Sequence, residues 1–329
     1  VLEGVLDLIN VAEAFPDACS PGQQTEVKRW RELVGAMLEW LDAMTHPDGE
    51  IVLFNDAALG VAPPRAELAE FANRLGVAHN RSQSLPVLHL RDTGYLRVQV
   101  GPATAFLDAG PLGPDYLPAH GHADTLTFEL SLHGRRVLVD TGVSTYQDGA
   151  ERLQQRGTAA HNTLLVDGED SSEVWGAFRV ARRARVFDVE VESLPDGVAV
   201  AAAHDGYLRL KGRTVHRRKW KLETDALTIE DTVAGHGEHD VHLAIHVHPD
   251  FSVFVDEAGL VIIQDGDGSA IARMSFDSWL VTEVASYDYH PEFGISLSAQ
   301  KTVSRWSGSL PARLSTKIAW TLNPGSVRL

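Results

Sequence analysis

Residues 120–140 read HGHADTLTFELSLHGRRVLVD, and this stretch shows how most of the chain is built. Apolar and polar residues alternate from Leu126 to Leu132, and a second short run ends at Asp140. His133-Gly134 stands between the two runs as a tight turn. Alternation with a period of two is typical of a strand with one buried face. The stretch therefore predicts two antiparallel strands joined by a turn.

Short strand-like runs continue on both sides of this hairpin, from Pro86 to the end of the chain. They are bounded by Gly, Asp and Pro, and their spacing favours a large antiparallel β-sandwich over alternating strands and helices. The predicted strands are Tyr95–Val100, Leu126–Leu132, Arg136–Asp140, Thr163–Val166, Ala184–Val191, Val198–Ala203, Thr214–Leu222, Leu227–Asp231, Val241–Val247, Gly259–Ile263, Ile271–Phe276, Val281–Ser286, Ile295–Ala299 and Thr316–Leu322.

Residues 1–80 differ from the rest because their apolar residues recur at helical spacing. Three helices are predicted: one around Leu8, one around Leu38, and one that follows Pro63-Pro64 and ends near Gly76. The predicted fold class is therefore α+β and multidomain, with helices first and strands second. We place the helical segment at residues 1–85 and the β-sandwich at residues 86–329.

Composition and charge limit the function classes. The 329 residues are 44% hydrophobic and 22% charged, as in globular proteins, and the net charge of −16 argues against sequence-independent binding to nucleic acid or anionic lipid. A single cysteine, Cys19, excludes an intramolecular disulfide. Residues 179–221 nevertheless hold eleven Lys or Arg and only five Asp or Glu. Such a band either focuses an anionic ligand at one face or consists of ordinary solvent-facing strand residues.

His120, His122 and Asp124 form the densest polar cluster. In an extended chain their side chains point to the same side, which is also the core face of the following strand. Buried imidazoles and carboxylates need a partner, a metal or a catalytic role. Asp140 and His161 complete a donor set suited to a divalent ion, although the hairpin leaves Asp140 about 16 Å from His122 unless the segment folds back. Strand-end histidines satisfied by hydrogen bonds are the alternative.

Four stretches resemble the heparinase II/III-like polysaccharide lyases, a family that includes heparin and heparan sulfate lyases and related alginate lyases. They are HGHADTLTFEL, GRRVLVDTGVSTY, RGTAAHNTLLVDGEDSSEVWGAFRVARRA and HRRKWKLETDALTIEDTVAG, the last running into HLAIHVHPD, and they lie within residues 115–250. The resemblance implies an incomplete α/α toroid followed by an antiparallel β-sandwich. Residues 1–80 then correspond to the last toroid helices, and we expect the chain to be the C-terminal part of a longer enzyme.

The resemblance also implies roles for single residues. His120 corresponds to a catalytic histidine at the substrate cleft. His122, together with Asp140 and His161, corresponds to the ligands of a structural zinc ion, which requires the segment to fold back. Contacts to the sugar are implied for four further residues, Arg156, Asn162, Arg152 and Tyr146.

The implied reaction is β-elimination at a uronic acid, on an anionic uronate polysaccharide such as a glycosaminoglycan or alginate. Histidine suits the proton transfers because its pKa lies near neutrality. The family's catalytic tyrosine, and the Asn or His that neutralises the substrate carboxylate, precede the matched region, so we expect this chain to be weakly active or inactive alone. The resemblance implies a bacterial protein that is periplasmic or secreted, although the chain shows no signal segment, and it is compatible with a homodimer.

Two alternatives remain open. A non-catalytic carbohydrate-binding β-sandwich or scaffold would have the same strand pattern without the reaction. A cupin-like metalloprotein would combine the His-x-His motif with Glu129, but Glu129 falls on the opposite strand face from His122. We therefore rank the lyase first, the binding module second and the cupin third.

Overall fold

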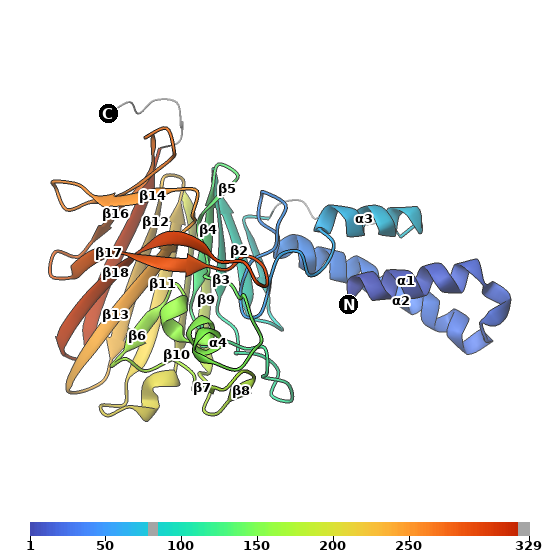
Figure 1. The fold of residues 1–329 in the computed structure, drawn as a ribbon, viewed down its shortest axis with the longest axis horizontal. Coiled ribbons are helices and arrows are strands. Elements are labelled where there is room, and N and C mark those ends of the chain that lie inside the picture. Colours follow the sequence, from blue (N-terminus) through green and yellow to red (C-terminus); the bar gives the residue numbers. More distant parts are fainter. Residues whose placement is uncertain (78–84, 322–329) are drawn as a thin grey trace.

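A computed structural model describes residues 1–77 and 85–321 of the protein. Helices occupy the N-terminal part of these residues and large antiparallel sheets occupy the rest, with the helices projecting from one side of the sheets (Figure 1). This order confirms the predicted α+β class. The proposed division at residue 85 stays a prediction, since it adjoins residues outside the described part. None of the described helices is both long enough and apolar enough to cross a membrane.

The N-terminal helices have a small core of their own. Ser20 caps the second helix, because its hydroxyl accepts a hydrogen bond from the backbone amide of Gln23 while the Gln23 side chain accepts one from Ser20. Leu6, Ile9 and Leu38 have no exposed surface and pack together. The predicted helices are confirmed, and they are α1 (Leu2–Ala14), the short 3-10 helix η1 (Pro16–Ala18), α2 (Pro21–Ala43) and α3 (Arg65–Arg74).

Two large sheets, in both of which neighbouring strands are antiparallel, follow the helices. In spatial order the first sheet contains β1 (Val87–Leu90), β2 (Tyr95–Val100), β3 (Ala103–Asp108), β4 (Phe128–Leu132), β5 (Arg135–Leu138), β13 (Glu238–Val247), β18 (Leu297–Ser309) and β17 (Val281–Tyr289), and β6 (Leu164–Val166) pairs with β13. The second contains β14 (Ser252–Val255), β15 (Val261–Gln264), β16 (Ala270–Phe276), β19 (Ala312–Trp320), β12 (Ala226–Ala234), β11 (Val215–Glu223), β10 (Gly197–His204) and β9 (Val186–Leu194).

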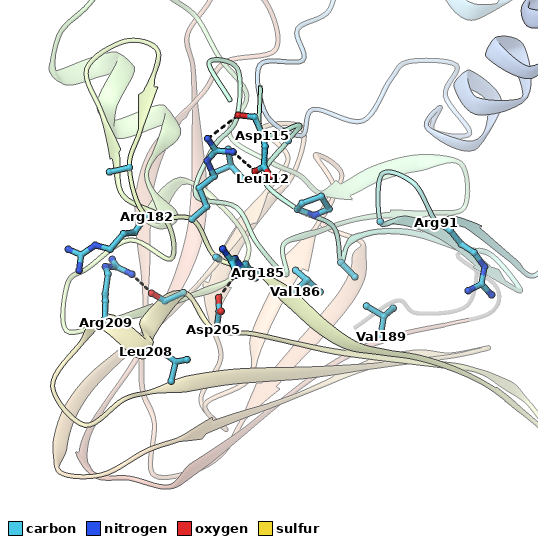
Figure 2. Close-up of a pocket in the computed structure, with 18 of the residues that line it drawn as sticks. Arg91, Leu112, Asp115, Arg182, Arg185, Val186, Val189, Asp205, Leu208 and Arg209 are labelled. Carbon is cyan, nitrogen blue, oxygen red and sulfur yellow. Dashed lines mark hydrogen bonds and ion pairs between the residues drawn. The ribbon is translucent and has the colours of Figure 1, made fainter. Parts of the chain in front are cut away.

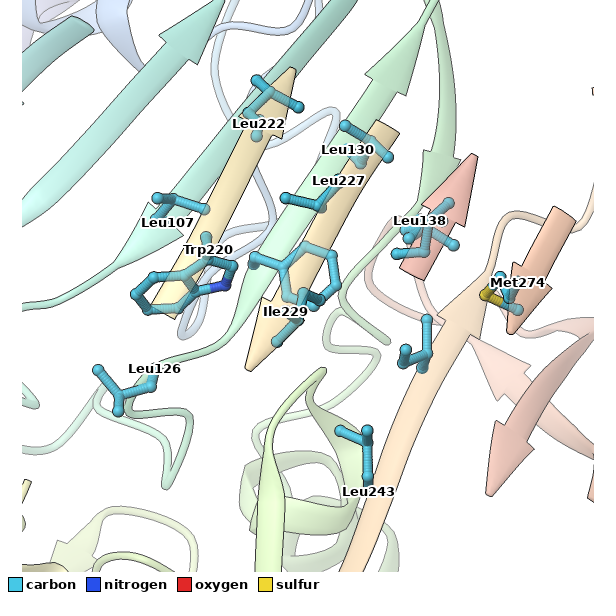
Figure 3. Packing of buried hydrophobic residues seen from close by; sticks show 14 of the residues in the cluster. Leu107, Leu126, Leu130, Leu138, Trp220, Leu222, Leu227, Ile229, Leu243 and Met274 are labelled. Atoms are coloured by element: carbon cyan, nitrogen blue, oxygen red, sulfur yellow. The ribbon is translucent and has the colours of Figure 1, made fainter. Parts of the chain in front are cut away.

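The main hydrophobic core lies between the two sheets (Figure 3). Trp220 and Leu222 of β11 pack in one cluster with Leu130 of β4 and Leu138 of β5, and each of these residues is at most 2% exposed. Alternate residues of β11 are buried, as expected for a strand with one face on the core. Filling this space with large side chains holds the first sheet, and the loops at its ends, in a fixed position.

The loops between β5 and β9 contain elements that the sequence pattern did not predict. The helix α4 (Ala150–Arg156), the 3-10 helix η2 (Thr158–Ala160) and a small ribbon of β7 (Val174–Trp175) and β8 (Arg179–Val180) lie here, and the 3-10 helix η3 (Gly206–Arg209) follows β10. The strands β1, β3 and β14 were likewise not predicted. The predicted strands otherwise match in position, and most ends differ by a few residues. The exception is β18, which continues to Ser309, well past the predicted end at Ala299. Leu322 of the last predicted strand lies outside the described residues.

The predicted extended course from His120 into β4 is wrong. Leu126 has a left-handed backbone with φ of 65°, and the amide of Thr127 donates to the carbonyl of Asp124 at 2.8 Å. The chain therefore turns at residues 124–127, and β4 begins at Phe128. This turn folds the His-x-His motif back toward Asp140. A metal site that includes both His122 and Asp140 requires such a fold-back.

Candidate active site

A single carboxylate, that of Asp56, connects the residues of the predicted site. Its Oδ2 lies 2.9 Å from Nδ1 of His120, and its Oδ1 lies 2.8 Å from Nε2 of His122. Arg152 on α4 donates to both oxygens, with Nη2 at 2.7 Å from Oδ2. The Asp56 side chain is 4% exposed and those of His122 and Arg152 have no exposed surface, so these two contacts are shielded from water. Asp56 therefore joins a loop that follows α2 to both histidines of the motif.

Buried polar groups hold the loop that carries Asp56. The backbone amide of Leu53 donates to Oε1 of Glu129 on β4 at 2.8 Å, and the other oxygen of Glu129 lies 2.9 Å from Nε2 of His46. Asn55 has φ of 55°, a conformation that asparagine tolerates better than most residues. Its side-chain oxygen accepts from the backbone amide of His122 at 2.9 Å. The loop is thus fixed both to the first sheet and to the motif.

His120 is the accessible member of the group, with a side chain that is 55% exposed. Its ring centroid lies 5.7 Å from that of Tyr146 and 6.1 Å from that of Phe178. Tyr146 also packs edge-on against Phe293, at 4.7 Å between centroids. A cavity of about 290 Å³ opens beside these rings and is lined in part by Asp56, Tyr146 and Phe293. The arrangement places the imidazole next to an aromatic wall, and Asp56 and Tyr146, which lie against it, also line the cavity.

Three of the four residues predicted to contact the sugar are fully buried. Arg152 pairs with Asp56, and Arg156 donates to the carbonyls of Gly121 and Gly176, at 2.8 Å for Nη2 and 2.9 Å for Nη1. These bonds fix the loops on either side of His120. Among the four, only Tyr146 offers exposed surface, 38% of the residue. A direct sugar contact by the buried arginines stays a prediction, and their role in this structure is to support the loops.

Asn162, the fourth of these residues, ties β4 and β13 to the residue that follows β5. Its side-chain nitrogen donates to the carbonyls of Phe128 and Val139, at 2.8 and 2.9 Å, and its side-chain oxygen accepts from the backbone amide of His246 at 2.7 Å. All hydrogen-bonding groups of the amide are thereby used inside the protein. A sugar contact for Asn162 also stays a prediction.

The predicted zinc ligands come close together without forming a complete ligand shell. His161 contacts Oδ2 of Asp140 through Nδ1 at 2.7 Å, and its ring centroid lies 5.4 Å from that of His122. Gly142 supports Asp140, because its amide donates to Oδ1 at 3.2 Å. Over residues 1–77 and 85–321, however, no group of three or more His, Cys, Asp or Glu side chains is arranged to hold a metal ion. The zinc therefore stays a prediction.

The same cluster contains buried polar atoms that lack a hydrogen-bond partner within the described part of the chain. They are Nδ1 of His122, Nε2 of His161 and both carboxylate oxygens of Asp124. Carboxylates only accept hydrogen bonds, so Asp56 takes an N–H from His122 and Asp140 takes one from His161. Burial keeps the His122 ring neutral, so its Nδ1 carries a lone pair. Asp140 holds the pKa of His161 above its ordinary value despite burial, so Nε2 of His161 carries a lone pair only when that ring gives up its second proton. Two such nitrogens and a free carboxylate have the donor chemistry that a divalent cation would satisfy.

Burial and charge shift the pKa values at the site. Burial lowers the pKa of His122 to about 3, which keeps the ring neutral. Burial alone would raise the pKa of Asp56, but the hydrogen bonds from His122 and Arg152 outweigh it and hold the pKa below its ordinary range. Burial raises the pKa of Asp124 to about 6 even though His161 acts in the opposite direction. Ionised Asp56 is therefore the permanent charge beside His120.

Glu129 takes no part in this cluster. Both of its oxygens are used by His46 and by the backbone of Leu53, on the helical side of the first sheet. The combination of His122 and Glu129 that a cupin-like site would need is therefore not formed.

Sequence reasoning missed Asp56, the residue that joins the site. It lies 64 residues before His120 and belongs to no recognisable motif. The signal available was a polar pair, Asn55-Asp56, between the apolar residues Phe54 and Ala57. A polar pair in such a setting needs hydrogen-bonding partners, which for Asp56 are the two histidines and Arg152.

Comparison with known proteins identifies the family and the fold of the chain. The family described as "Heparinase II/III-like, C-terminal" matches residues 82–321. The heparan sulfate lyase HepC from Pedobacter heparinus matches with a TM-score of 0.69 at 16% identity, covering 96% of this chain and 51% of that chain. A crystal structure of heparinase III matches with a TM-score of 0.70 at 17% identity, covering 97% of this chain and 53% of that chain. No curated protein matches the chain at a significant level.

The chain spans about half the length of these solved structures. At such low identities the structural likeness shows the fold alone, whereas the family match rests on the sequence of most of the chain. Because that match covers residues 82–321, the protein belongs to the heparinase II/III-like family, whose C-terminal region it matches.

Proposed function

We propose that this chain is part of a polysaccharide lyase that cleaves a uronate-containing anionic polysaccharide by β-elimination. The observation that carries the proposal is the pairing of an exposed His120 with a buried Asp56. A carboxylate at Nδ1 fixes the tautomer of an imidazole and stabilises its protonated form. Nε2 of His120 is then free to exchange a proton with a bound sugar.

In the proposed reaction the C5–H bond of the uronate breaks, and its electron pair forms the C4–C5 double bond as the C4–O4 bond breaks. His120 takes the C5 proton or delivers a proton to the departing O4, a contribution of about 10²–10⁴-fold. The rings of Tyr146 and Phe178 lie beside His120 and give a sugar face a surface to pack against. Asp56 and Arg152 hold the imidazole in position.

The proposal includes a structural zinc ion near His122. Nδ1 of His122 and Nε2 of His161 would hold it, together with a carboxylate. Asp140 is the ligand implied by family resemblance, but it supports His161 from behind in this structure, and Asp124 has the unpaired oxygens. When bound, zinc would neutralise the buried carboxylates and tie the motif to the loop before β6.

The test is direct detection of the unsaturated product by its ultraviolet absorbance. The full-length gene product and this chain alone are each incubated with heparan sulfate, with alginate and with a neutral glucan. We expect product from at least one uronate polymer with the full-length protein, none from the glucan, and little from the chain alone. If neither protein releases unsaturated product from any uronate polymer although both bind it, the fold serves as a binding module and the lyase proposal is wrong.

A further inference from the structure

A second cavity, about 890 Å³ in volume, lies on the sandwich and shares no lining residue with the candidate active site. It is bordered by the β1–β2 turn, the loop after β3, the loop between β8 and β9, the start of β9, and η3, and Figure 2 shows its labelled residues. Two aspartates, Asp115 and Asp205, also lie in its wall. Five arginines line the cavity, and they are Arg91, Arg182, Arg183, Arg185 and Arg209.

Three of these arginines already have partners in the protein. Arg182 forms a two-pronged ion pair with Glu173, and Arg209 donates to the carbonyls of Gly206 and Asp170. Arg183 contacts Asp115 at 2.9 Å. The Asp115 side chain is fully exposed, so this pair is weak and an anionic ligand can take the place of Asp115.

Arg185 and Arg91 are the other two arginines that line the cavity. Neither guanidinium makes a hydrogen bond or an ion pair with a residue in the described ranges. The carboxylate of Asp205 lies close to Arg185, but it accepts from the backbone amide of Arg185 at 2.7 Å and not from the side chain. The wall of the cavity therefore presents two unpaired cations, with Arg185 near the other arginines and Arg91 further along (Figure 2).

The shape and the other lining residues indicate the class of ligand. Val186, Val189 and Leu208 line the space between the charged groups. Guanidinium groups match planar or tetrahedral oxyanions, and the apolar patches suit the faces of sugar rings. Apart from His89 no aromatic ring lines the cavity, so the stacking platform typical of single-stranded nucleic acid sites is missing from the described lining. On a protein of net charge −16, such a cavity concentrates anions locally.

We propose that this cavity binds a carboxylated or sulfated oligosaccharide, as a second saccharide site beside the one at His120. The two sites are connected through the chain: Asp115 and His120 belong to one loop, and Arg182 follows Phe178 after four residues. An anionic polymer held here would keep its neighbouring segments close to the candidate active site. The identification of the ligand as an anionic saccharide rests on the proposed function. The presence of the cavity and of its unpaired arginines does not depend on that function.

The experiment measures binding of a fluorescently labelled heparin tetrasaccharide to this chain by anisotropy. The variants are Arg185→Gln, the double variant Arg91→Gln/Arg185→Gln, and His120→Ala. Arg313→Gln is the matched control, because Arg313 is an exposed arginine on β19, outside the cavity. Since only the backbone of Arg185 contacts Asp205, its substitution by Gln should leave the fold intact, which circular dichroism checks.

We expect Arg185→Gln to weaken binding about tenfold, as for loss of one charged hydrogen bond, and the double variant to weaken it further. Arg313→Gln should change binding less than about twofold. An oligouronate without sulfate and a sulfated oligosaccharide both support the proposal if they bind with the same dependence on Arg185. Wild-type affinity in the double variant would overturn it, as would binding of inorganic sulfate or single-stranded DNA as tightly as the tetrasaccharide.

The outcome is separable from that of the lyase assay. Loss of product without loss of Arg185-dependent binding leaves the cavity proposal standing and removes the lyase. If product forms but binding does not depend on Arg185 or Arg91, the lyase proposal stands and the cavity proposal is wrong.

Discussion

The carboxylate of Asp56 contacts Nδ1 of His120 at 2.9 Å, across 64 positions of sequence. The same carboxylate neutralises Arg152, whose side chain has no exposed surface. The conspicuous His-x-His motif is therefore held by a residue from the loop after α2. The site at this position forms only when the helical segment and the β-sandwich are in contact. The loop that carries Asp56 is therefore needed to position His120.

Replacing Asp56 by Asn should destabilise the protein by about 3–5 kcal/mol, because it leaves the buried guanidinium of Arg152 without a counter-ion. Urea unfolding followed by fluorescence gives the free energy. Asp265→Asn is the matched control, since Asp265 pairs with Arg135 at the surface and should cost less than about 1 kcal/mol. Equal losses in the two variants would contradict the role assigned to Asp56.

Replacing Gly142 by Ala should cost several kcal/mol and displace Asp140. Gly142 has φ of 72°, and an added Cβ would lie 2.1 Å from the carbonyl oxygen of His290. Gly134 has φ of 83° but open space around the same position, so Gly134→Ala measures the backbone strain alone, about 1–2 kcal/mol. Thermal unfolding of both variants checks the difference. A Gly142 variant as stable as the Gly134 variant would show that the loop can shift freely.

The protein should lose stability as pH falls below about 6.5. Nε2 of His204 lies 3.1 Å from Nδ1 of His216, and both rings are fully buried. Burial lowers the pKa of His204 well below its ordinary value, and it lowers that of His216 despite the hydrogen bond to Asp231. Both rings are neutral when folded and bind protons on unfolding, so their contribution is complete above pH 6.5 and is lost progressively at lower pH.

The measurement is the free energy of unfolding in urea at pH 7.5 and at a pH about two units lower. His204→Gln should reduce its pH dependence by up to about 1.4 kcal/mol per pH unit, the value for one proton. His242→Gln, which alters a half-buried histidine on β13, should not. An unchanged pH dependence in His204→Gln would mean that the ring is protonated in the folded protein.

If zinc binds where we propose, the purified protein should contain about one zinc ion per chain, and a chelator should lower its melting temperature. His122→Ala should abolish stoichiometric zinc, since it removes the unpartnered Nδ1. His248→Ala, at a half-buried histidine outside the cluster, should retain it. Elemental analysis decides the question, and full zinc content in His122→Ala would exclude His122 as a ligand.

Much of the fold follows from the sequence because strand alternation and helical spacing are local signals. The runs at residues 95–100, 214–222 and 241–247 were recognisable from their apolar residues and the turn residues that bound them. The turn at residues 124–127 was not, since it depends on a left-handed Leu126 that no local preference suggests. It is stabilised by long-range bonds, such as the one from the Leu126 amide to the carbonyl of Asp108.

The residues of the candidate site likewise fall into those that the sequence predicts and those that it does not. His120, His122, Asp140 and His161 stand out because titratable residues entering a strand need an explanation. Asp56 does not stand out, because its partners lie in a different part of the chain. The exposure of each residue was also beyond reach: Arg152, Arg156 and Asn162 are buried, although they come from a polar segment that sequence alone would place on a surface loop.

The central claim is that His120 transfers the proton in a β-elimination. Its most direct test is the rate of unsaturated-product formation by the full-length gene product and by its His120→Ala variant, with His248→Ala as control. We predict a loss of at least about 10²-fold in kcat for His120→Ala at unchanged stability, and a rate within about twofold of wild type for the control. A His120→Ala protein that releases unsaturated product at the wild-type rate would contradict the account.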